Sequence, residues 1–186
     1  MSDGPADMVR AATMADVPAL QSLINLSVRG LSAAHYTATQ IDAALDDVFG
    51  VDTQLISDGT YYVIDGPSGP AAAGGWSARR TLFGGDQMKP AEDLRLDPAV
   101  DAARIRAFFV HPDWARRGLA SRLYDACERA ASAEGFGSFE LMATLPGVPL
   151  YRALGFTDVE RVVLTLRNGV AVPFVRMTRR IGPGDR

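Results

Sequence analysis

Hydrophobic residues follow two different periods along the chain, and together they predict a mixed fold of helices and strands. In some segments apolar residues recur every three or four positions, as on one face of a helix, and in others they alternate or run together, as in strands. The predicted helices cover residues 16–28, 37–48, 118–134 and 146–154. The predicted strands cover residues 8–12, 60–65, 71–79, 104–110, 138–143, 159–166 and 170–178. This order fits a single domain over residues 8–180, with residues 1–7 and 181–186 as flexible tails.

Turn signals between the predicted strands fix part of their arrangement. Gly, Pro and Ser at residues 66–70 predict one hairpin, and Asn-Gly at residues 168–169 predicts another. A helix joins the strand at 104–110 to the strand at 138–143, which predicts a parallel βαβ unit. Residues 82–102 show little periodicity, and a loop of this length in a compact domain is typically a functional lid or a disordered segment.

Composition and charge narrow the classes of function. The 186 residues are 47% hydrophobic and 22% charged, as in an ordinary globular domain. A net charge of −3 gives no basic field for nucleic acid or a membrane surface, and no apolar segment is long enough to span a bilayer. Because no basic segment followed by an apolar one stands near residue 1, we expect a cytoplasmic protein.

The few cysteines and histidines argue against disulfide and metal chemistry. Cys127 is the only cysteine, and its place on the apolar face of the helix at 118–134 predicts core packing rather than a reactive thiol. His35 and His111 are far from each other and from Cys127 in the sequence. No metal-ligand spacing results, and we expect no metal.

The junction between a strand and a helix at residues 105–121 predicts an anion site. Pro112 should end the strand, because proline cannot donate to a sheet ladder. Small side chains at the start of the next helix let backbone N–H groups approach a ligand closely, and the helix dipole favours negative charge there. The residues concerned are Arg116, Arg117, Gly118, Leu119, Ala120 and Ser121. The alternative is that the small residues serve only close packing between strand and helix.

Two motifs together resemble the GNAT superfamily of acyl-CoA-dependent N-acetyltransferases. The phosphate loop of that family, Gln/Arg-x-x-Gly-x-Gly/Ala, is similar to residues 115–120, and its motif Leu/Phe-Tyr-x-x-x-Gly-Phe is similar to residues 150–156. Ala115 departs from the pattern, which weakens one expected contact. The resemblance implies a mostly antiparallel central sheet with a splayed parallel strand pair and flanking helices, which is an α+β or α/β fold.

The resemblance also implies where acetyl-CoA binds. The backbone of Phe108, Phe109 and Val110 is expected to hold the pantetheine arm at a bulged strand, and the loop at 116–121 to hold the diphosphate. The Val110 N–H is the expected oxyanion donor. Tyr151 matches the position of the family's general acid, and a tyrosine with a pKa of about 10 keeps its proton at pH 7. A purely structural tyrosine is the alternative.

The general base and the acceptor site are less constrained by the sequence. Glu140 is the candidate base, and His111 is a second group that can titrate. The alternative for Glu140 is an ion pair with an arginine, and the alternative for His111 is a loop residue without a catalytic role. Residues near the acceptor, by resemblance or by position, are Tyr36, with His35 beside it, Trp76 and Arg106. Packing is the alternative for the tyrosine and the tryptophan. Arginine is rarely buried unpaired, so Arg106 either pairs with an acid or meets an anionic part of the substrate.

These observations predict an enzyme that moves acetyl from acetyl-CoA to an amine of a small molecule or peptide, by direct attack in a ternary complex. A non-catalytic acyl-CoA-binding or sensor domain on the same fold is the alternative, and a nucleotide-binding βαβ protein is a third. Arginines 79, 80, 104 and 106 suggest an acidic acceptor. The family also admits a homodimer.

Overall fold

The computed structural model describes residues 8–182. The expected tails at residues 1–7 and 183–186 lie outside the described residues. Ile181, which we expected to belong to the C-terminal tail, donates its backbone N–H to Gly137 O at 2.9 Å. The ordered chain therefore continues beyond residue 180.

The described strands form one mixed sheet. They are β1 Val9–Ala11, β2 Tyr61–Gly66, β3 Gly69–Ser77, β4 Ala103–Val110, β5 Ser138–Thr144, β6 Thr157–Thr165 and β7 Ala171–Arg180. Their order across the sheet is β1-β2-β3-β4-β5-β7-β6. Every neighbouring pair is antiparallel except β4 and β5, which are parallel. The predicted fold class is confirmed.

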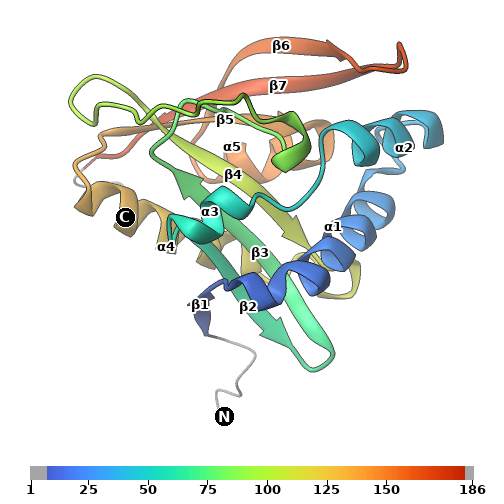
Figure 1. Ribbon diagram of the computed structural model, residues 1–186, viewed down its shortest axis with the longest axis horizontal. Helices are drawn as coiled ribbons and strands as arrows, with labels where there is room; N and C mark the ends of the chain where they lie inside the picture. The colour runs from blue at the N-terminus through green and yellow to red at the C-terminus, as the bar shows by residue number, and fades with distance from the viewer. Residues whose placement is uncertain (1–7, 183–186) are drawn as a thin grey trace.

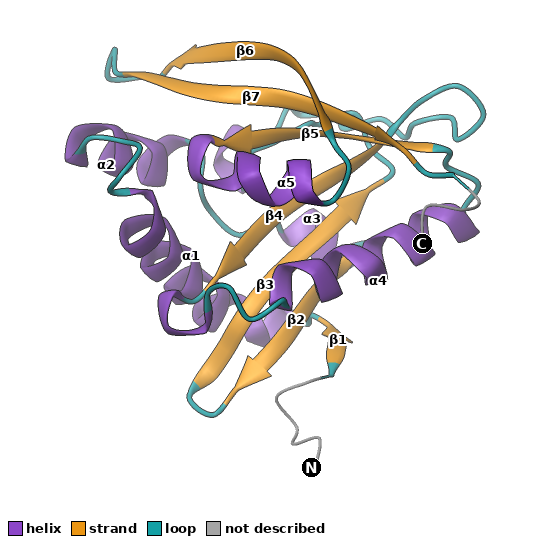
Figure 2. Cartoon of the chain, turned by 180° about the vertical axis from the view of Figure 1, so that it is seen from behind, coloured by secondary structure: helices purple, strands orange, loops and turns teal. Residues whose placement is uncertain are grey.

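Helices cover both faces of this sheet. They are α1 Val17–Ser32, α2 Ala38–Asp47, α3 Thr53–Ser57, α4 Leu119–Ala133 and α5 Val148–Ala153, with short 3₁₀ turns that include Asp86–Met88, Pro112–Trp114 and Leu145–Gly147. Figure 1 shows α1, α2 and α3 in front of the sheet, and Figure 2, from behind, shows α4 and α5 on the other face. The middle of the sheet is therefore covered on both faces, whereas the edge strand β6 is largely exposed.

The side-chain alternation of the strands explains these two layers. Tyr61 and Val63 of β2 pack into a cluster with α1, while Ile64 packs on the opposite face with Leu123 of α4. Cys127 of α4 is fully buried, as its place on the apolar face predicted. Each layer thus has a core of its own, on either side of the sheet.

The parallel pair β4–β5 separates soon after it begins, and this creates the site. The two strands are in register only at Ala103–Phe139 and Arg104–Glu140. Beyond these pairs β5 stays with β7 through Thr144, whereas β4 stays with β3 through Val110. The two halves of the sheet therefore diverge, as Figure 1 shows, and the gap between β4 and β5 faces α1 on one side and α5 on the other.

The long loop at residues 82–102 packs on the domain instead of standing free. Its Gly85 N–H donates to Val48 O at 2.9 Å, and its Asp86 accepts from the backbone and hydroxyl of Thr53. Asp52 and Lys89 form a further ion pair between the same two segments. The start of the loop is thereby held against the chain that links α2 to α3.

Candidate active site

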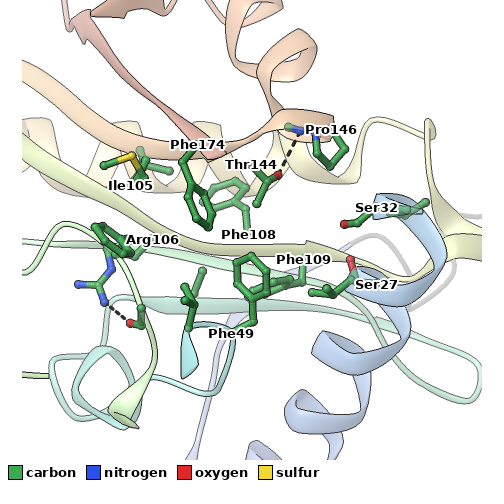
Figure 3. A pocket seen from close by; sticks show the side chains of 18 of the residues that line it. Ser27, Ser32, Phe49, Ile105, Arg106, Phe108, Phe109, Thr144, Pro146 and Phe174 are labelled. Carbon is green, nitrogen blue, oxygen red and sulfur yellow. Dashed lines mark hydrogen bonds between the residues drawn. The ribbon is translucent and has the colours of Figure 1, made fainter. Parts of the chain in front are cut away.

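A pocket of about 220 Å³ opens where β4 and β5 diverge. Its walls come from α1, the end of α2, the loop at 82–85, β4, β5, α5 and β7. Figure 3 shows Arg106 at one end of this pocket, Ser27 and Ser32 at the other, and phenylalanine rings between them. One cavity therefore joins the region expected to hold the cofactor with the region expected to hold the acceptor.

A bulge in β4 shapes the middle of the pocket. The register with β3 passes from Ala73–Phe109 to Gly75–Arg106, so that one residue of β3 faces two of β4. Ala107 has a φ of 54°, which is uncommon for a residue with a side chain. Gly74 is required opposite the bulge, since a Cβ there would lie 2.6 Å from the Phe108 ring. The strand is thus bulged beside residues 108–110, where the resemblance implied it.

One backbone donor at this bulge is already engaged. The Val110 N–H, which we expected to stabilise the oxyanion, donates to the Ser27 Oγ of α1 at 3.2 Å. Ser27 is buried and lines the pocket, and nothing in its place on a helix signalled this contact. A substrate oxygen would have to displace the serine hydroxyl to reach this N–H.

The start of α4 is an open set of backbone donors. Gly118 is in the left-handed region with a φ of 80°, and no side chain caps the helix. The N–H groups of the first helical turn have no partner within the helix. Arg116 is exposed, and Arg117 stacks over the Trp114 ring at 4.8 Å. These features fit the anion site that the sequence predicted, and Leu119, whose side chain is buried, can offer it only a backbone group.

Tyr151 reaches the same pocket from α5. Its ring packs edge-on against Phe108, with centroids 6.3 Å apart, and only 8% of the residue is exposed. Tyr151 is one of the residues that line the pocket, and it also packs in the core cluster that includes Cys127 and Phe156. Burial raises the pKa of Tyr151 above its ordinary value of about 10. The hydroxyl is therefore protonated at neutral pH.

The candidate bases lie elsewhere. Glu140 accepts from Arg176 Nη1 at 2.5 Å and also pairs with Arg104, and it is not among the residues that line the pocket. His111 accepts from the backbone N–H of Asp113 at 3.2 Å and does not line it either. The structure thus places Glu140 in the ion-pair role that was its alternative.

Arg106 is buried and paired with an acid. Its Nη2 donates to Asp52 Oδ2 at 2.8 Å and to Gly84 O at 2.6 Å, and its Nη1 donates to Thr81 O at 2.7 Å. Only 2% of the residue is exposed, and burial lowers the pKa of the guanidinium while the charge of Asp52 opposes that shift. Of the two readings left open by the sequence, the geometry matches the pairing with an acid.

The other two residues expected near the acceptor do not line the pocket. The Tyr36 hydroxyl donates to Pro173 O at 2.8 Å and accepts from Leu145 N–H at 2.9 Å, and burial raises the pKa of this tyrosine to about 12. Trp76 is 1% exposed and packs against Phe136, with ring centroids 5.9 Å apart. Tyr36 therefore ties the α1–α2 link to β7, and Trp76 belongs to the core.

Aromatic rings that sequence reasoning missed line the pocket. Phe49 lies edge-on to Phe109 at 6.1 Å and to Phe174 at 6.2 Å, and Phe83 stacks on Phe174 at 6.2 Å. The four rings come from four separate segments, and no periodicity links them. Only Phe109 was singled out from the sequence, and then for its backbone.

Charge is scarce in this pocket. Arg106 and Tyr151 are its only titratable lining residues, and the arginine is paired. Two more arginines that suggested an acidic acceptor are also paired, Arg79 with Asp58 at 2.6 Å and Arg104 with Glu140. Over residues 8–182 there is no cluster of side chains able to hold a metal, and no helix there could cross a membrane.

Comparison with known proteins identifies the fold and a domain match over part of the chain. The model of the acetyltransferase (GNAT) domain matches residues 98–181, which include β4, α4 and α5. A GCN5-related N-acetyltransferase from Rhodopseudomonas palustris is 20% identical, with a TM-score of 0.68 over 97% of this chain and 98% of that one. A phosphinothricin acetyltransferase from Sinorhizobium meliloti, solved in complex with AcCoA, is 18% identical, with a TM-score of 0.62 over 97% and 91%.

A third structure, the PaiA N-acetyltransferase from Thermoplasma acidophilum in complex with coenzyme A, is 12% identical, with a TM-score of 0.61 over 93% of this chain and 98% of that one. The search of curated proteins gives no match. At these identities the solved structures establish the fold alone, and the domain match covers residues 98–181, less than half of the 186 residues. The chain has the fold of the GNAT N-acetyltransferases, and its C-terminal part matches the acetyltransferase (GNAT) domain.

Proposed function

We propose that this protein transfers an acetyl group from acetyl-CoA to an amine, with Tyr151 as the general acid. The observation that carries the proposal is the place of Tyr151, which lines the pocket and packs on Phe108 beside the β4 bulge. The uncapped start of α4 contributes Ala120 to the same pocket. A diphosphate on that helix end would direct the thioester toward the tyrosine. The acetyltransferases of this fold solved with coenzyme A or AcCoA support that choice of ligand.

The proposed reaction needs little beyond positioning, because a thioester is already activated. The lone pair of the amine nitrogen attacks the thioester carbonyl carbon, and a C–N bond forms. The C–S bond then breaks, and its electron pair leaves with the sulfur of CoA. The nitrogen loses one proton to solvent, and the thiolate gains one proton from the Tyr151 hydroxyl, which solvent restores. The products are an acetamide and free CoA.

The raised pKa of Tyr151 sets the expected pH dependence. The protonated hydroxyl is the active form of a general acid, and its folded pKa lies above the ordinary value of about 10. The turnover number should therefore not fall through deprotonation of this group as the pH rises to about 10. The expected loss comes only at still higher pH.

The test of this role is Tyr151→Phe. We expect the turnover number to fall by about 10²- to 10⁴-fold, the usual contribution of general acid–base catalysis. The dissociation constant for CoA, measured by calorimetry, should change little because the ring remains. Tyr62→Phe is the control, since it removes a hydroxyl from a tyrosine outside the pocket. Full turnover in Tyr151→Phe with normal CoA binding would contradict the assignment of Tyr151 as the general acid.

CoA binding itself is tested by thermal unfolding with CoA, acetyl-CoA, ATP or NAD. A ligand at a hundred times its dissociation constant stabilises the folded state by about 2.7 kcal/mol. We expect a shift with the two CoA species alone. Binding of acetyl-CoA without release of thiol to any amine would instead fit an acyl-CoA-binding domain.

A further inference from the structure

The pocket wall is mainly hydrocarbon. Phe49, Phe83, Phe109 and Phe174 line it, and each ring contacts another within 6.2 Å between centroids. Further apolar side chains line the same pocket, namely Val28, Leu31, Val48, Leu82, Ile105 and Met142. The whole pocket, including the region expected to hold the cofactor, has a volume of about 220 Å³, below the range of roughly 300–1,000 Å³ for sites of drug-sized ligands. The part left for an acceptor therefore suits a small molecule.

No group in this wall can balance a charge on the acceptor. The lining residues include no carboxylate, imidazole or ammonium group, and Arg106 is paired with Asp52 and also donates to Thr81 O and Gly84 O. Two acids considered for a role in the site are engaged in ion pairs, Asp52 with two cations and Glu140 with two arginines. An ammonium would lose its hydration here without a counter-ion, and an anion would find no free cation.

The lack of such groups also limits how the nucleophile can form. The lone pair of the nitrogen must be free before it attacks, and the lining residues offer no base to remove a proton. An alkylamine with a pKa near that of lysine, about 10.4, is neutral in only about one molecule in a thousand at pH 7.4. The nitrogen of an aromatic amine or an aromatic hydrazide is a far weaker base and is neutral at that pH.

We propose that the acceptor is a small aromatic amine or hydrazide, uncharged at neutral pH. Its ring would lie among the four phenylalanines, and its nitrogen would point toward the β4 bulge and Tyr151. This inference rests on the proposed acetyl transfer and adds the class of substrate. The atoms balance as above, with an N-aryl acetamide or a diacyl hydrazine as product, and the proton lost by nitrogen goes to water.

Matched pairs of amines test the class of acceptor. One pair is 4-methylaniline and 4-methylcyclohexylamine, which share a carbon skeleton, and the other is benzhydrazide and 2-phenylethylamine. Binding to protein saturated with CoA is measured by calorimetry, and thiol release is measured with acetyl-CoA. We expect the first member of each pair to bind at least tenfold more tightly and to be acetylated at least a hundredfold more efficiently.

The outcomes separate the two proposals. Failure of CoA to bind would overturn the acetyl transfer itself. Binding of CoA combined with equal or tighter binding of the alkylamines would overturn only the aromatic class. The same conclusion would follow if neither aromatic compound bound to the CoA complex.

A variant in the wall gives a second readout. Phe83→Ala removes one ring from the acceptor end, and we expect the KM for 4-methylaniline to rise at least tenfold with an unchanged dissociation constant for CoA. Leu94→Ala is the control in the same loop, because Leu94 is 52% exposed and does not line the pocket. An unchanged KM in a folded Phe83→Ala protein would contradict the proposed position of the ring.

Discussion

Replacement of Arg106 by methionine tests how the pocket wall is held. The Arg106 and Asp52 side chains are each 1% exposed, and their charged atoms lie 2.8 Å apart. The substitution keeps much of the hydrophobic volume but leaves the Asp52 carboxylate with one cation, Lys89. Removing one member of a buried pair typically costs about 3–5 kcal/mol. We expect about 3 kcal/mol, the lower end of that range, because Lys89 and two backbone N–H groups still contact Asp52.

The loss should be measurable by thermal and by urea unfolding. In a chain of this size each kcal/mol lowers the unfolding midpoint by about 2–4 °C, so that 3 kcal/mol corresponds to about 6–12 °C. Arg152→Met is the matched control. Its pair with Asp158 lies at the surface, with 59% and 39% of the side chains exposed. Surface pairs contribute about 0–1 kcal/mol, so this variant should unfold close to the parent.

A double variant separates the pair from the residues around it. Arg106→Met combined with Asp52→Asn removes both charges, and we expect it to be more stable than the sum of the two single changes predicts. The reasoning would be refuted if Arg106→Met cost no more than Arg152→Met. If the Arg106→Met protein were as stable as the parent but had lost all activity, the result would support the other interpretation, in which Arg106 contacts the substrate.

Two further predictions concern backbone space and acid stability. Gly74→Ala forces a Cβ to 2.6 Å from the Phe108 ring and should cost about 1–3 kcal/mol in urea unfolding, whereas Gly137→Ala, with open space, should be near neutral; equal effects would contradict the clash. Pairing with Arg10 lowers the pKa of Asp16 to about 2, so its contribution is present above about pH 4 and lost as the pH falls through 2. Asp16→Asn should therefore lower the free energy of unfolding by about 1–2 kcal/mol at pH 7, after allowance for screening by solvent, and by less at pH 2. The same loss at both pH values would contradict this prediction.

Features encoded by neighbouring residues could be predicted from the sequence. The Asn-Gly pair at 168–169 does form the turn of the β6–β7 hairpin, with Gly169 at a φ of 81°. Gly118 does begin a helix, and Gly155 does follow one, because these positions need a positive φ that glycine adopts freely. The helix α3 was missed, since five residues are too few to show a period, although Asp52 caps it through two backbone N–H groups.

Features that depend on depth or on distant partners could not be predicted. Alternation along β3 indicates a face for Trp76 but not whether that face lines a pocket or a core. Arg106 and Asp52 stand 54 positions apart, and only the folded chain shows that they pair. Tyr36 likewise bonds to carbonyl and amide groups more than a hundred positions away. The role of each of these side chains was predicted from its residue type, which does not specify its partner.

The site likewise has two halves: one is marked by local sequence motifs, and the other is formed by residues far apart in the sequence. The proposed cofactor half consists of a bulge and a helix end, which offer backbone groups and are marked by short motifs around Gly118 and Tyr151. The proposed acceptor half consists of side chains from the segment after α2, the loop at 82–85, β4 and β7, which no motif connects. A change in one phenylalanine can therefore alter the acceptor without disturbing the motif that identifies the family. This is a physical reason why one fold serves many acceptors, and why the acceptor must be inferred from the wall of the pocket.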